Sequence, residues 1–313
     1  MADIVVTEFM DEGALEALDA SCLYDPTLVE DRARMLAALG SARAIVVRNR
    51  TQVDVELLGA APALKVVGRL GVGLDNIDLA ACAARGVAVR PATGANTLSV
   101  AEYVISTAMA LVRGAYASNA AMIAGAWPRG ALIGGELSGR TLGLYGYGGI
   151  ARAVAVRAHA LGMTVIAHDP HVPEEDAGWA GAERVTADDL LARADVLSLH
   201  VPLTDETRGM IGAEALAAMK PGAVLINTAR GGVVDEAALC AALSAGRLGG
   251  AALDVFETEP LTAEAGAIFA GVPNLILTPH IAGVTQEGNV RVSTVTVANV
   301  LEELAKTRRE TRP

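Results

Sequence analysis

Short runs rich in Val, Ile and Leu recur along the whole chain, and patterns typical of helices separate them. Such runs predict strands that are buried on both faces of a sheet. Strands that alternate with helices of roughly 10 to 15 residues predict βαβ crossovers, parallel pairing and helices on both sides of the sheet. The sequence therefore predicts an α/β fold. The predicted strands cover residues 4–7, 45–48, 64–69, 142–145, 164–167, 196–200, 223–227, 250–255 and 275–278.

The chain has 313 residues, enough for about two domains at roughly 150 residues each. Two long helical patterns, at residues 98–113 and 286–304, bracket the middle of the chain and its glycine-rich turn. We therefore expect a discontinuous arrangement. Residues 1–97 together with 288–313 form one domain, expected to bind substrate, and residues 98–287 form a second, expected to bind a dinucleotide.

Charge and composition exclude several classes of protein. The formal net charge of −11 is opposite in sign to a nucleic-acid-binding surface, and the start of the chain has no basic segment typical of a secretion signal. The apolar stretch at residues 100–112 is interrupted by Glu102 and is too short to span a membrane. Three widely spaced cysteines suggest neither a disulfide framework nor a metal site. We expect a cytoplasmic protein without metal, nucleic-acid or membrane partners.

The sequence G-Y-G-G-I-A at residues 146–151 follows a predicted strand and opens a predicted helix. In this G-x-G-x-x-A pattern Gly146 permits a tight turn, Gly148 allows a pyrophosphate close to the backbone, and Ala151 allows close packing of helix on strand. Gly149 and Ile150 begin the helix. The next strand ends at Asp169, where a carboxylate can bind the ribose hydroxyls and would repel a 2′-phosphate. We therefore predict NAD as the cofactor, in preference to NADP.

Three further polar residues, Arg230, Glu259 and His280, each lie shortly after a predicted strand. Because ligands bind at the carboxyl edge of open α/β sheets, these side chains are expected to converge there. Arginine can hold a carboxylate through two hydrogen bonds, histidine can transfer a proton, and a nearby glutamate favours the imidazolium. This set is suited to hydride transfer between a 2-hydroxy acid and a nicotinamide.

Over essentially its full length the chain resembles the D-2-hydroxyacid dehydrogenase family, in its phosphoglycerate-dehydrogenase-like branch and in a short form without a regulatory domain. The resemblance rests on five ordered motifs: G-R-L-G-V-G-L-D-N-I-D at 68–78, the dinucleotide turn with its acid, N-T-A-R-G-G-V-V-D-E at 227–236, L-D-V-F-E-T-E-P at 253–260 and T-P-H at 278–280. Ala151 stands in place of the third glycine and is small enough to leave cofactor binding intact.

This resemblance implies two Rossmann-like, doubly wound parallel-sheet domains with a cleft between them that closes on substrate. It implies that Arg230 binds the substrate carboxylate and keto oxygen, that His280 is the general acid/base, and that Glu259 is its partner. It also implies that Asp254 contacts the nicotinamide amide and that backbone N–H groups of the loop Gly71, Val72 and Gly73 hold the carboxylate.

Four arginines suggest a second anionic group on the substrate. Arg48 and Arg50 follow a predicted strand, Arg69 precedes the loop at 71–73, and Arg129 follows Trp127 and Pro128. In this branch, cations at similar positions face the far end of a phosphorylated three-carbon acid. Guanidinium groups suit phosphate or sulfonate oxygens. We expect 3-phosphoglycerate first, with (S)-3-sulfolactate or a D-lactate or glycerate type of acid as alternatives.

Other functions use the same motifs. Relatives of this family act as NAD-sensing scaffolds or corepressors, which would need a partner groove or tails, and a formate-type dehydrogenase would not need the pairing of Glu259 with His280. Steady NADH production from a 2-hydroxy acid distinguishes an enzyme from a scaffold. The apolar pattern at 98–112, followed by a second expected helix at 115–127, resembles the family's dimer-forming segment, and we expect a homodimer.

Overall fold

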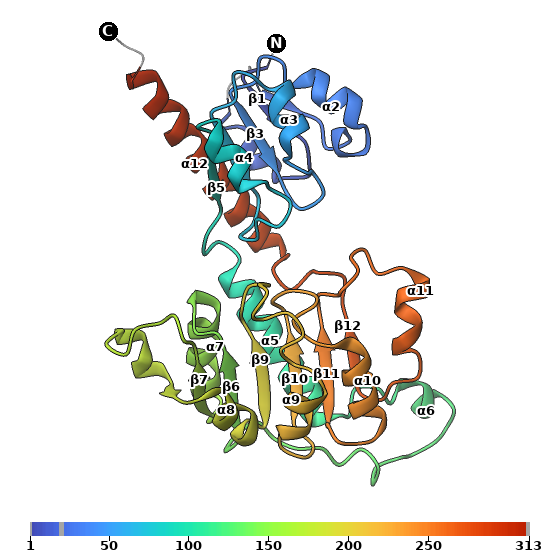
Figure 1. Ribbon diagram of the computed structural model, residues 1–313. Helices are drawn as coiled ribbons and strands as arrows, with labels where there is room; N and C mark the ends of the chain where they lie inside the picture. The colour runs from blue at the N-terminus through green and yellow to red at the C-terminus, as the bar shows by residue number, and fades with distance from the viewer. Residues whose placement is uncertain (1, 19–21, 311–313) are drawn as a thin grey trace. The chain divides into compact units, whose positions relative to one another are not determined.

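The computed structural model describes residues 2–18 and 22–310, and it has two compact units (Figure 1). Unit 1 comprises Met1–Asn96 and Val284–Pro313, and unit 2 comprises Thr97–Gly283. Each unit has a sheet of its own with parallel strand pairs, which confirms the predicted α/β class with two doubly wound domains. Within the described residues, no helix is both long and apolar enough to span a membrane.

Unit 1 is built on a five-stranded sheet, counted over the described residues, with the order β2-β1-β3-β4-β5. The chain order is reversed between β1 and β3, which are paired in parallel. The strands are β1 Ile4–Val6, β2 Cys22–Tyr24, β3 Ala44–Val47, β4 Val66–Arg69 and β5 Ala88–Pro91. The helices are α1 Glu12–Leu15, α2 Arg32–Ala38, α3 Val55–Ala60, α4 Leu79–Ala84 and α12 Gln286–Glu310, with a 3₁₀ turn at Leu28–Glu30.

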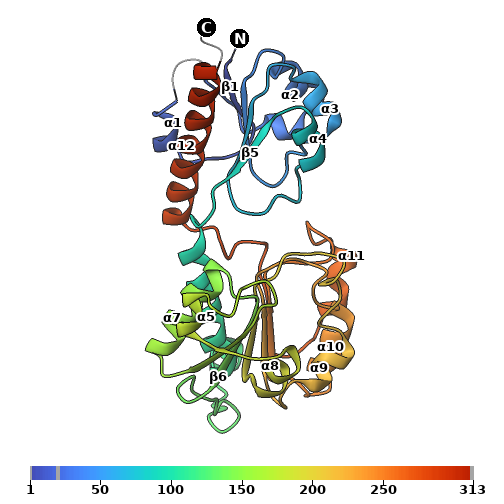
Figure 2. The ribbon, with the colours of Figure 1, turned by 60° about the vertical axis from the view of Figure 1, so that its left-hand side comes forward.

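Helices cover both faces of the unit 1 sheet (Figure 2). On one face, Met35, Leu57 and Cys82 from α2, α3 and α4 pack against β-strand residues. On the other face, α1 and α12 pack against the sheet through residues such as Val297 and Val300. Helices start where a side chain can accept the otherwise unpaired N–H groups of the first turn. Asp31, Asp54 and Asp78 do so for α2, α3 and α4.

Unit 2 is built on a seven-stranded sheet, again over the described residues, with the order β12-β11-β10-β9-β6-β7-β8. The strands are β6 Thr141–Tyr145, β7 Thr164–His168, β8 Glu183–Arg184, β9 Val196–Leu199, β10 Val224–Asn227, β11 Gly250–Leu253 and β12 Leu275–Leu277. The helices are α5 Thr97–Arg113, α6 Asn119–Ile123, α7 Gly149–Ala160, α8 Ala187–Arg193, α9 Ala213–Ala218, α10 Glu236–Ser244 and α11 Ala263–Gly266, with 3₁₀ turns at Ala177–Gly181 and Ala267–Phe269.

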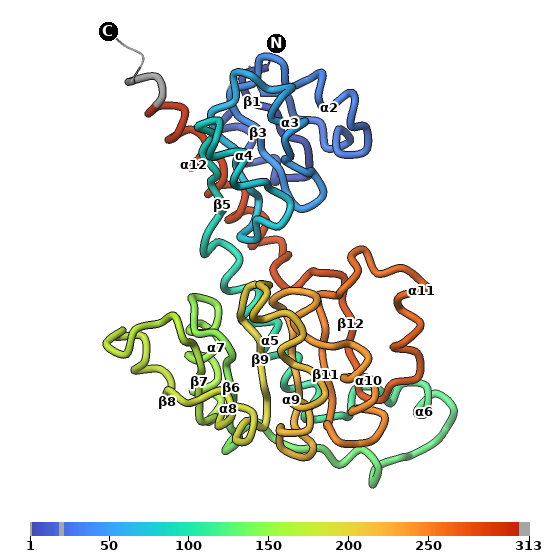
Figure 3. Tube along the Cα trace, viewed as in Figure 1, coloured from blue at the N-terminus to red at the C-terminus, as the bar shows by residue number. Residues whose placement is uncertain are grey.

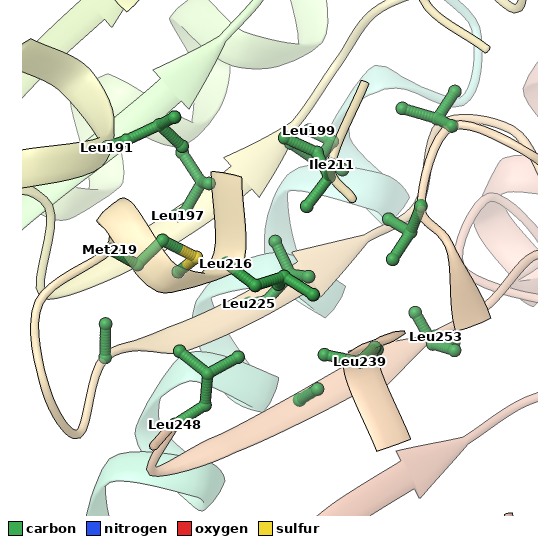
Figure 4. Close-up of a cluster of buried hydrophobic side chains, with 14 of the residues drawn as sticks. Leu191, Leu197, Leu199, Ile211, Leu216, Met219, Leu225, Leu239, Leu248 and Leu253 are labelled. Atoms are coloured by element: carbon green, nitrogen blue, oxygen red, sulfur yellow. The ribbon is translucent and has the colours of Figure 1, made fainter. Parts of the chain in front are cut away.

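Two helical layers enclose this sheet. Helices α5 and α7 cover one face, and α8, α9 and α10 cover the other (Figure 2). Figure 4 shows the second layer, where Leu216 and Leu239 from the helices meet Leu197, Leu225 and Leu253 from the strands. The strand order reverses between β6 and β9, and ligands bind outside the carboxyl ends of strands at such a reversal. The strand order therefore indicates the edge of the sheet at which a ligand site is expected.

The segment at residues 114–140 connects the end of α5 to the start of β6 (Figure 3). The predicted second helix at 115–127 is much shorter than expected, because only Asn119–Ile123 is helical. Ser118 precedes this helix without a side-chain cap, and Gly125 follows in a left-handed conformation. Most of the segment is therefore loop.

Candidate active site

The glycine-rich turn between β6 and α7 leaves room for a ligand against the backbone. Gly146 has a positive φ of 88°, and a Cβ there would lie 2.6 Å from the carbonyl oxygen of His200. At Gly148 and Gly149, in contrast, a Cβ would meet no atom within 4 Å. Gly148 is the N-cap of α7, so this open space lies at a helix N-terminus, where N–H groups attract anions. Ile150 is half-buried in the first turn of the helix.

Asp169 lies beside the same turn. Its Oδ2 accepts the backbone N–H of Tyr147 at 2.8 Å, and its Oδ1 accepts that of His171 at 2.8 Å. Because the carboxylate is anchored by two backbone groups, it is held next to the turn before any ribose binds. The space at Gly148 and the anchored acid fit a dinucleotide with an unphosphorylated adenosine ribose.

The loop after β12 holds His280 in an unusual conformation. His280 has a positive φ of 52°, and its backbone N–H donates to the carbonyl of Asp254 at 2.8 Å. The buried carboxylate of Asp254 accepts the hydroxyl of Thr278 at 2.6 Å and the N–H groups of Ile281 and Ala282 at 2.8 Å each. Asp254 therefore organises the turn that presents His280, and its predicted contact with the nicotinamide amide stays a prediction.

Glu259 reaches the imidazole from the loop after β11. Its Oε2 lies 2.7 Å from Nδ1 of His280, and its Oε1 accepts the N–H of Phe256 at 3.0 Å. Burial alone would raise the pKa of Glu259, but the hydrogen bonds from His280 and Phe256 and the charges of His280 and Arg230 lower it overall. An ionised Glu259 accepts a hydrogen bond from a protonated Nδ1, so Nε2 is the ring nitrogen left for a substrate.

Arg230 completes this group from the loop after β10. The side-chain amide of Asn227 donates to the carbonyl of Arg230 at 3.0 Å, which shapes the loop, and the guanidinium donates to the carbonyl of Ala229 at 2.6 Å. Its charge is one of those that lower the pKa of Glu259. The structure thus brings Arg230, Glu259 and His280 together at the carboxyl ends of adjacent strands, as expected from their positions in the sequence.

Several polar groups near these residues were not singled out from the sequence. The hydroxyl groups of Tyr103, on α5, and Thr278 lie 2.6 Å apart and extend the Asp254 network. Thr228 Oγ1 is buried and, among the described residues, has no hydrogen-bond partner. Both threonines stand within the motifs at 227–236 and 278–280, directly after a strand, and this position was the signal that could have identified them.

In unit 1, the arginines that follow β3 lie at the strand reversal between β1 and β3. The buried carboxylate of Glu8, just after β1, accepts the backbone N–H groups of Arg48, Arg50 and Thr51 at 2.8 to 3.1 Å. The Arg48 guanidinium donates to Asn289 Oδ1 at 2.6 Å. Burial lowers the pKa of Arg48, and the charge of Glu8 opposes that effect. The exposed Arg50 guanidinium lies 3.6 Å from Glu30.

Arg69 ends β4 and folds over the loop at 71–73. Its guanidinium donates to the carbonyl of Leu70 at 2.7 Å. Gly71 has a φ of 145°, and a Cβ there would lie 1.8 Å from the Arg69 guanidinium. Val72 is exposed and Gly73 is half-buried. The loop is thus shaped by the arginine before it, while its predicted role in binding a carboxylate stays a prediction.

Arg129 lies elsewhere in its unit. It is exposed, and its backbone N–H donates to the carbonyl of Trp127 at 2.8 Å. By residue number it belongs to the segment that runs from the end of α5 to the start of β6. The segment leads into the amino end of β6, whereas His280 follows the carboxyl end of β12. Within unit 2, therefore, the structure does not bring Arg129 to the edge that holds His280.

Comparisons with known proteins agree with this arrangement. Residues 105–282 match the NAD binding domain of the D-isomer specific 2-hydroxyacid dehydrogenases. The chain is 57% identical over 307 residues to (S)-sulfolactate dehydrogenase of Chromohalobacter salexigens, covering 97% of this chain and 99% of that protein. It is 45% identical over 275 residues to D-3-phosphoglycerate dehydrogenase of Mycobacterium bovis, covering 88% of this chain but 52% of that protein.

A solved structure is also similar. D-lactate dehydrogenase from Aquifex aeolicus, complexed with NAD and lactic acid, has a TM-score of 0.83 and 32% identity, covering 98% of this chain and 96% of that one. The chain belongs to the D-isomer specific 2-hydroxyacid dehydrogenase family, as the resemblance indicated. It is an NAD-dependent dehydrogenase, and the space at Gly148 beside the anchored Asp169 fits that cofactor.

Proposed function

We propose that this protein interconverts (S)-3-sulfolactate and 3-sulfopyruvate with NAD. The observation that carries the choice of substrate is the 57% identity to a sulfolactate dehydrogenase across nearly the full length of both chains. From the sequence alone, 3-phosphoglycerate is the expected substrate. The relatives named for that substrate are less similar and are aligned over about half of their own length, which favours the sulfonate instead.

We assign the chemistry to the group at the carboxyl edge of the unit 2 sheet. Arg230 binds the substrate carboxylate. In the oxidative direction Nε2 of His280 takes the proton from the C2 hydroxyl oxygen, while C2 itself loses the hydride. Bound NAD supplies the acceptor for the hydride. Glu259, 2.7 Å from Nδ1, then stabilises the imidazolium, because an ionised carboxylate favours the charged ring.

We assign Arg48 and Arg50 to the sulfonate. The local charge supports a monoanion: Glu8 lies close enough to Arg48 to affect its pKa, and Glu30 lies 3.6 Å from Arg50. Each arginine therefore has an acid beside it, and the formal charges of Glu8 and Glu30 balance those of Arg48 and Arg50. A phosphate monoester carries about −1.5 to −2 charges at neutral pH and would meet more repulsion from these acids than a sulfonate does.

The stereochemical label is consistent with a D-specific family. In lactate the carboxylate ranks above the methyl group, whereas in 3-sulfolactate the sulfur makes the C3 substituent rank above the carboxylate. The arrangement called D in lactate is therefore labelled S in sulfolactate. An enzyme that presents His280 and the nicotinamide as D-specific relatives do is expected to act on the S form.

The test is a panel of kcat/KM values with NAD for both enantiomers of 3-sulfolactate, 3-phosphoglycerate, D-glycerate and D-lactate. We expect (S)-3-sulfolactate to exceed every other acid by at least about tenfold, since a charged hydrogen bond contributes roughly 1.5 kcal/mol or more. Preference for 3-phosphoglycerate would overturn the sulfonate assignment. Preference for an acid with an uncharged tail would overturn the role of Arg48 and Arg50.

We also propose that the protein is a homodimer that uses the segment at 114–140. Its side chains Tyr116, Ile123, Trp127 and Ile133 are 73%, 88%, 76% and 83% exposed, an unusual set of large apolar residues for a solvated surface. Sedimentation at micromolar concentration is expected to show twice 32.0 kDa. Ile123→Asp should give monomers, and Val55→Asp, at an exposed position on α3, should not. A monomeric wild-type protein would refute the proposal.

A further inference from the structure

Two contacts restrain the peptide unit between Phe256 and Glu257. The backbone at Gly231 packs against it, since a Cβ there would stand 1.6 Å from the Phe256 carbonyl oxygen and 2.9 Å from the Glu257 nitrogen. In addition, the Glu257 N–H donates to Oε1 of Glu236 at 2.7 Å. The backbone of the Arg230 loop and one carboxylate thus fix a single peptide in the loop after β11.

This peptide lies at the base of the turn that carries Glu259. The N–H of Phe256 donates to Glu259 Oε1 at 3.0 Å, while Oε2 of the same carboxylate lies 2.7 Å from His280 Nδ1. A shift of the peptide from Phe256 to Glu257 would move the Phe256 backbone and therefore the hydrogen bond that orients Glu259. A continuous path of contacts thus runs from Glu236 to the imidazole.

Glu236 is unusual because its ionisable side chain is buried. It is the first residue of α10 and only 8% exposed, although ionisable side chains are seldom buried. The helix does not need it as a cap, because Asp235 accepts the N–H of Ala238 at 2.9 Å. Helical propensity and capping therefore leave the buried carboxyl group unexplained.

Its surroundings are mostly acidic. Burial raises the pKa of Glu236, the hydrogen bond from Glu257 lowers it, and the charges of Glu257, Asp235 and Glu259 raise it. One turn further along α10, burial and the charge of Glu236 raise the pKa of Cys240. A carboxyl group kept at this position despite repulsion from three acids needs a specific use, and its hydrogen bond to the Glu257 N–H provides one.

We propose that Glu236 is a positioning residue for the acid/base pair: by holding the Glu257 N–H against the backbone at Gly231, it keeps Glu259 oriented toward His280. This inference rests on the proposed roles of Glu259 and His280. Glu236 itself touches neither substrate nor cofactor in this account. Its effect is therefore expected in kcat, through the position of Glu259, and not in NAD binding.

Three substitutions test this. Glu236→Ala removes the acceptor, Glu236→Asp withdraws the carboxylate by one methylene, and Glu236→Gln keeps an acceptor oxygen at the same reach. We expect kcat to fall about 10- to 100-fold in the alanine variant, by the amount expected for a displaced catalytic group, and less in the aspartate variant. The glutamine variant should stay within about threefold of wild type, and Kd for NAD should stay within about twofold in all three.

Asp195→Asn is the matched control. Asp195 also holds a backbone N–H, that of Thr141 at 2.8 Å, but at the amino end of β6, far along the strand from the site. The substitution Asp195→Asn should lower Tm without lowering kcat by more than about twofold. The proposal is overturned if Glu236→Ala and Glu236→Asp keep wild-type kcat, or if kcat of Glu236→Gln falls as far as that of Glu236→Ala. It is also overturned if Asp195→Asn lowers kcat as much as Glu236→Ala does when the two variants have the same Tm. Near wild-type kcat in His280→Ala would instead refute the proposed function.

Discussion

Oε2 of Glu259 lies 2.7 Å from Nδ1 of His280, and this contact assigns one ring nitrogen to the protein and the other to the substrate. Because hydrogen bonds and nearby positive charges outweigh burial and lower the pKa of Glu259, the carboxylate stays ionised at neutral pH. The tautomer of His280 with the proton on Nδ1 is thereby stabilised. The loops after β11 and β12 together set up a proton acceptor at Nε2.

Glu259→Gln should lower kcat/KM for the 2-hydroxy acid by roughly 100-fold, within the range typical of general acid/base catalysis. The amide keeps the size of the side chain but removes the charge that stabilises the imidazolium. Steady-state NADH formation measures the effect, with Glu264→Gln as a control at an exposed acid on α11. Wild-type kcat/KM in the Glu259 variant would show that the contact has no part in catalysis.

Cofactor choice should depend on Asp169. The wild-type ratio of kcat/KM for NAD to that for NADP should exceed about tenfold, because the carboxylate favours ribose hydroxyls and repels a 2′-phosphate. Asp169→Ser should reduce this ratio by at least about tenfold. If the wild type used both cofactors equally, neighbouring groups such as His171 would have to override the aspartate.

Gly231→Ala should damage both stability and activity. The new Cβ would lie 1.6 Å from the Phe256 carbonyl oxygen, so backbone must move, at a cost of about 1 to 3 kcal/mol in the free energy of unfolding. Gly59→Ala is the control, since a Cβ in that position of α3 meets nothing within 4 Å and should stabilise the helix by about 0.5 to 1 kcal/mol. Urea unfolding and kcat measure both effects. Equal stability and kcat in the two variants would contradict the close packing.

Stability should fall in mildly acidic solution because of His200. Burial lowers the pKa of His200 from 6.5 to about 4, and its Nε2 lies 3.0 Å from Ser198 Oγ. Between these two pH values the unfolded chain binds a proton that the folded chain does not, so the contribution of His200 to stability is full above pH 6.5 and is lost as the pH falls toward 4. The loss is on the order of 3 kcal/mol.

His200→Asn should therefore flatten the dependence of the unfolding free energy on pH between 6.5 and 4. His171→Asn, which removes an exposed imidazole instead of a buried one, is the control. Urea unfolding at several pH values measures both variants. The same slope in wild type and His200→Asn would mean that the imidazole of His200 is not kept neutral by burial.

The interior strands could be predicted from the sequence because burial on both faces leaves continuous apolar runs. The strands that were missed, β2, β5 and β8, lie at the edges of their sheets. Their residues are mostly exposed or half-buried, and β8 is the two-residue sequence Glu183–Arg184. An edge strand has only one neighbour and less burial, so it need not carry an apolar run. The edge strand β12 was predicted because its three residues, Leu275–Leu277, are all apolar.

The site was predictable to a similar extent. Arg230 and Glu259 follow the interior strands β10 and β11, and His280 follows the edge strand β12. The common direction of these strands brings the three residues to one edge. Sequence could not show how their loops are held. An acid at the first position of a helix is ordinary for electrostatic reasons, so Glu236 gave no signal. Likewise, the pairing of Glu8 with the backbone after β3 joins segments about 40 residues apart.

The most direct test of the account is NADH formation from (S)-3-sulfolactate by wild type and His280→Ala, with Kd for NAD measured on the same preparations. Removing the proton acceptor should lower kcat by roughly 10²- to 10⁴-fold. Kd for NAD should change by less than about twofold, because the dinucleotide turn and Asp169 are untouched. Near wild-type turnover by His280→Ala would contradict the account.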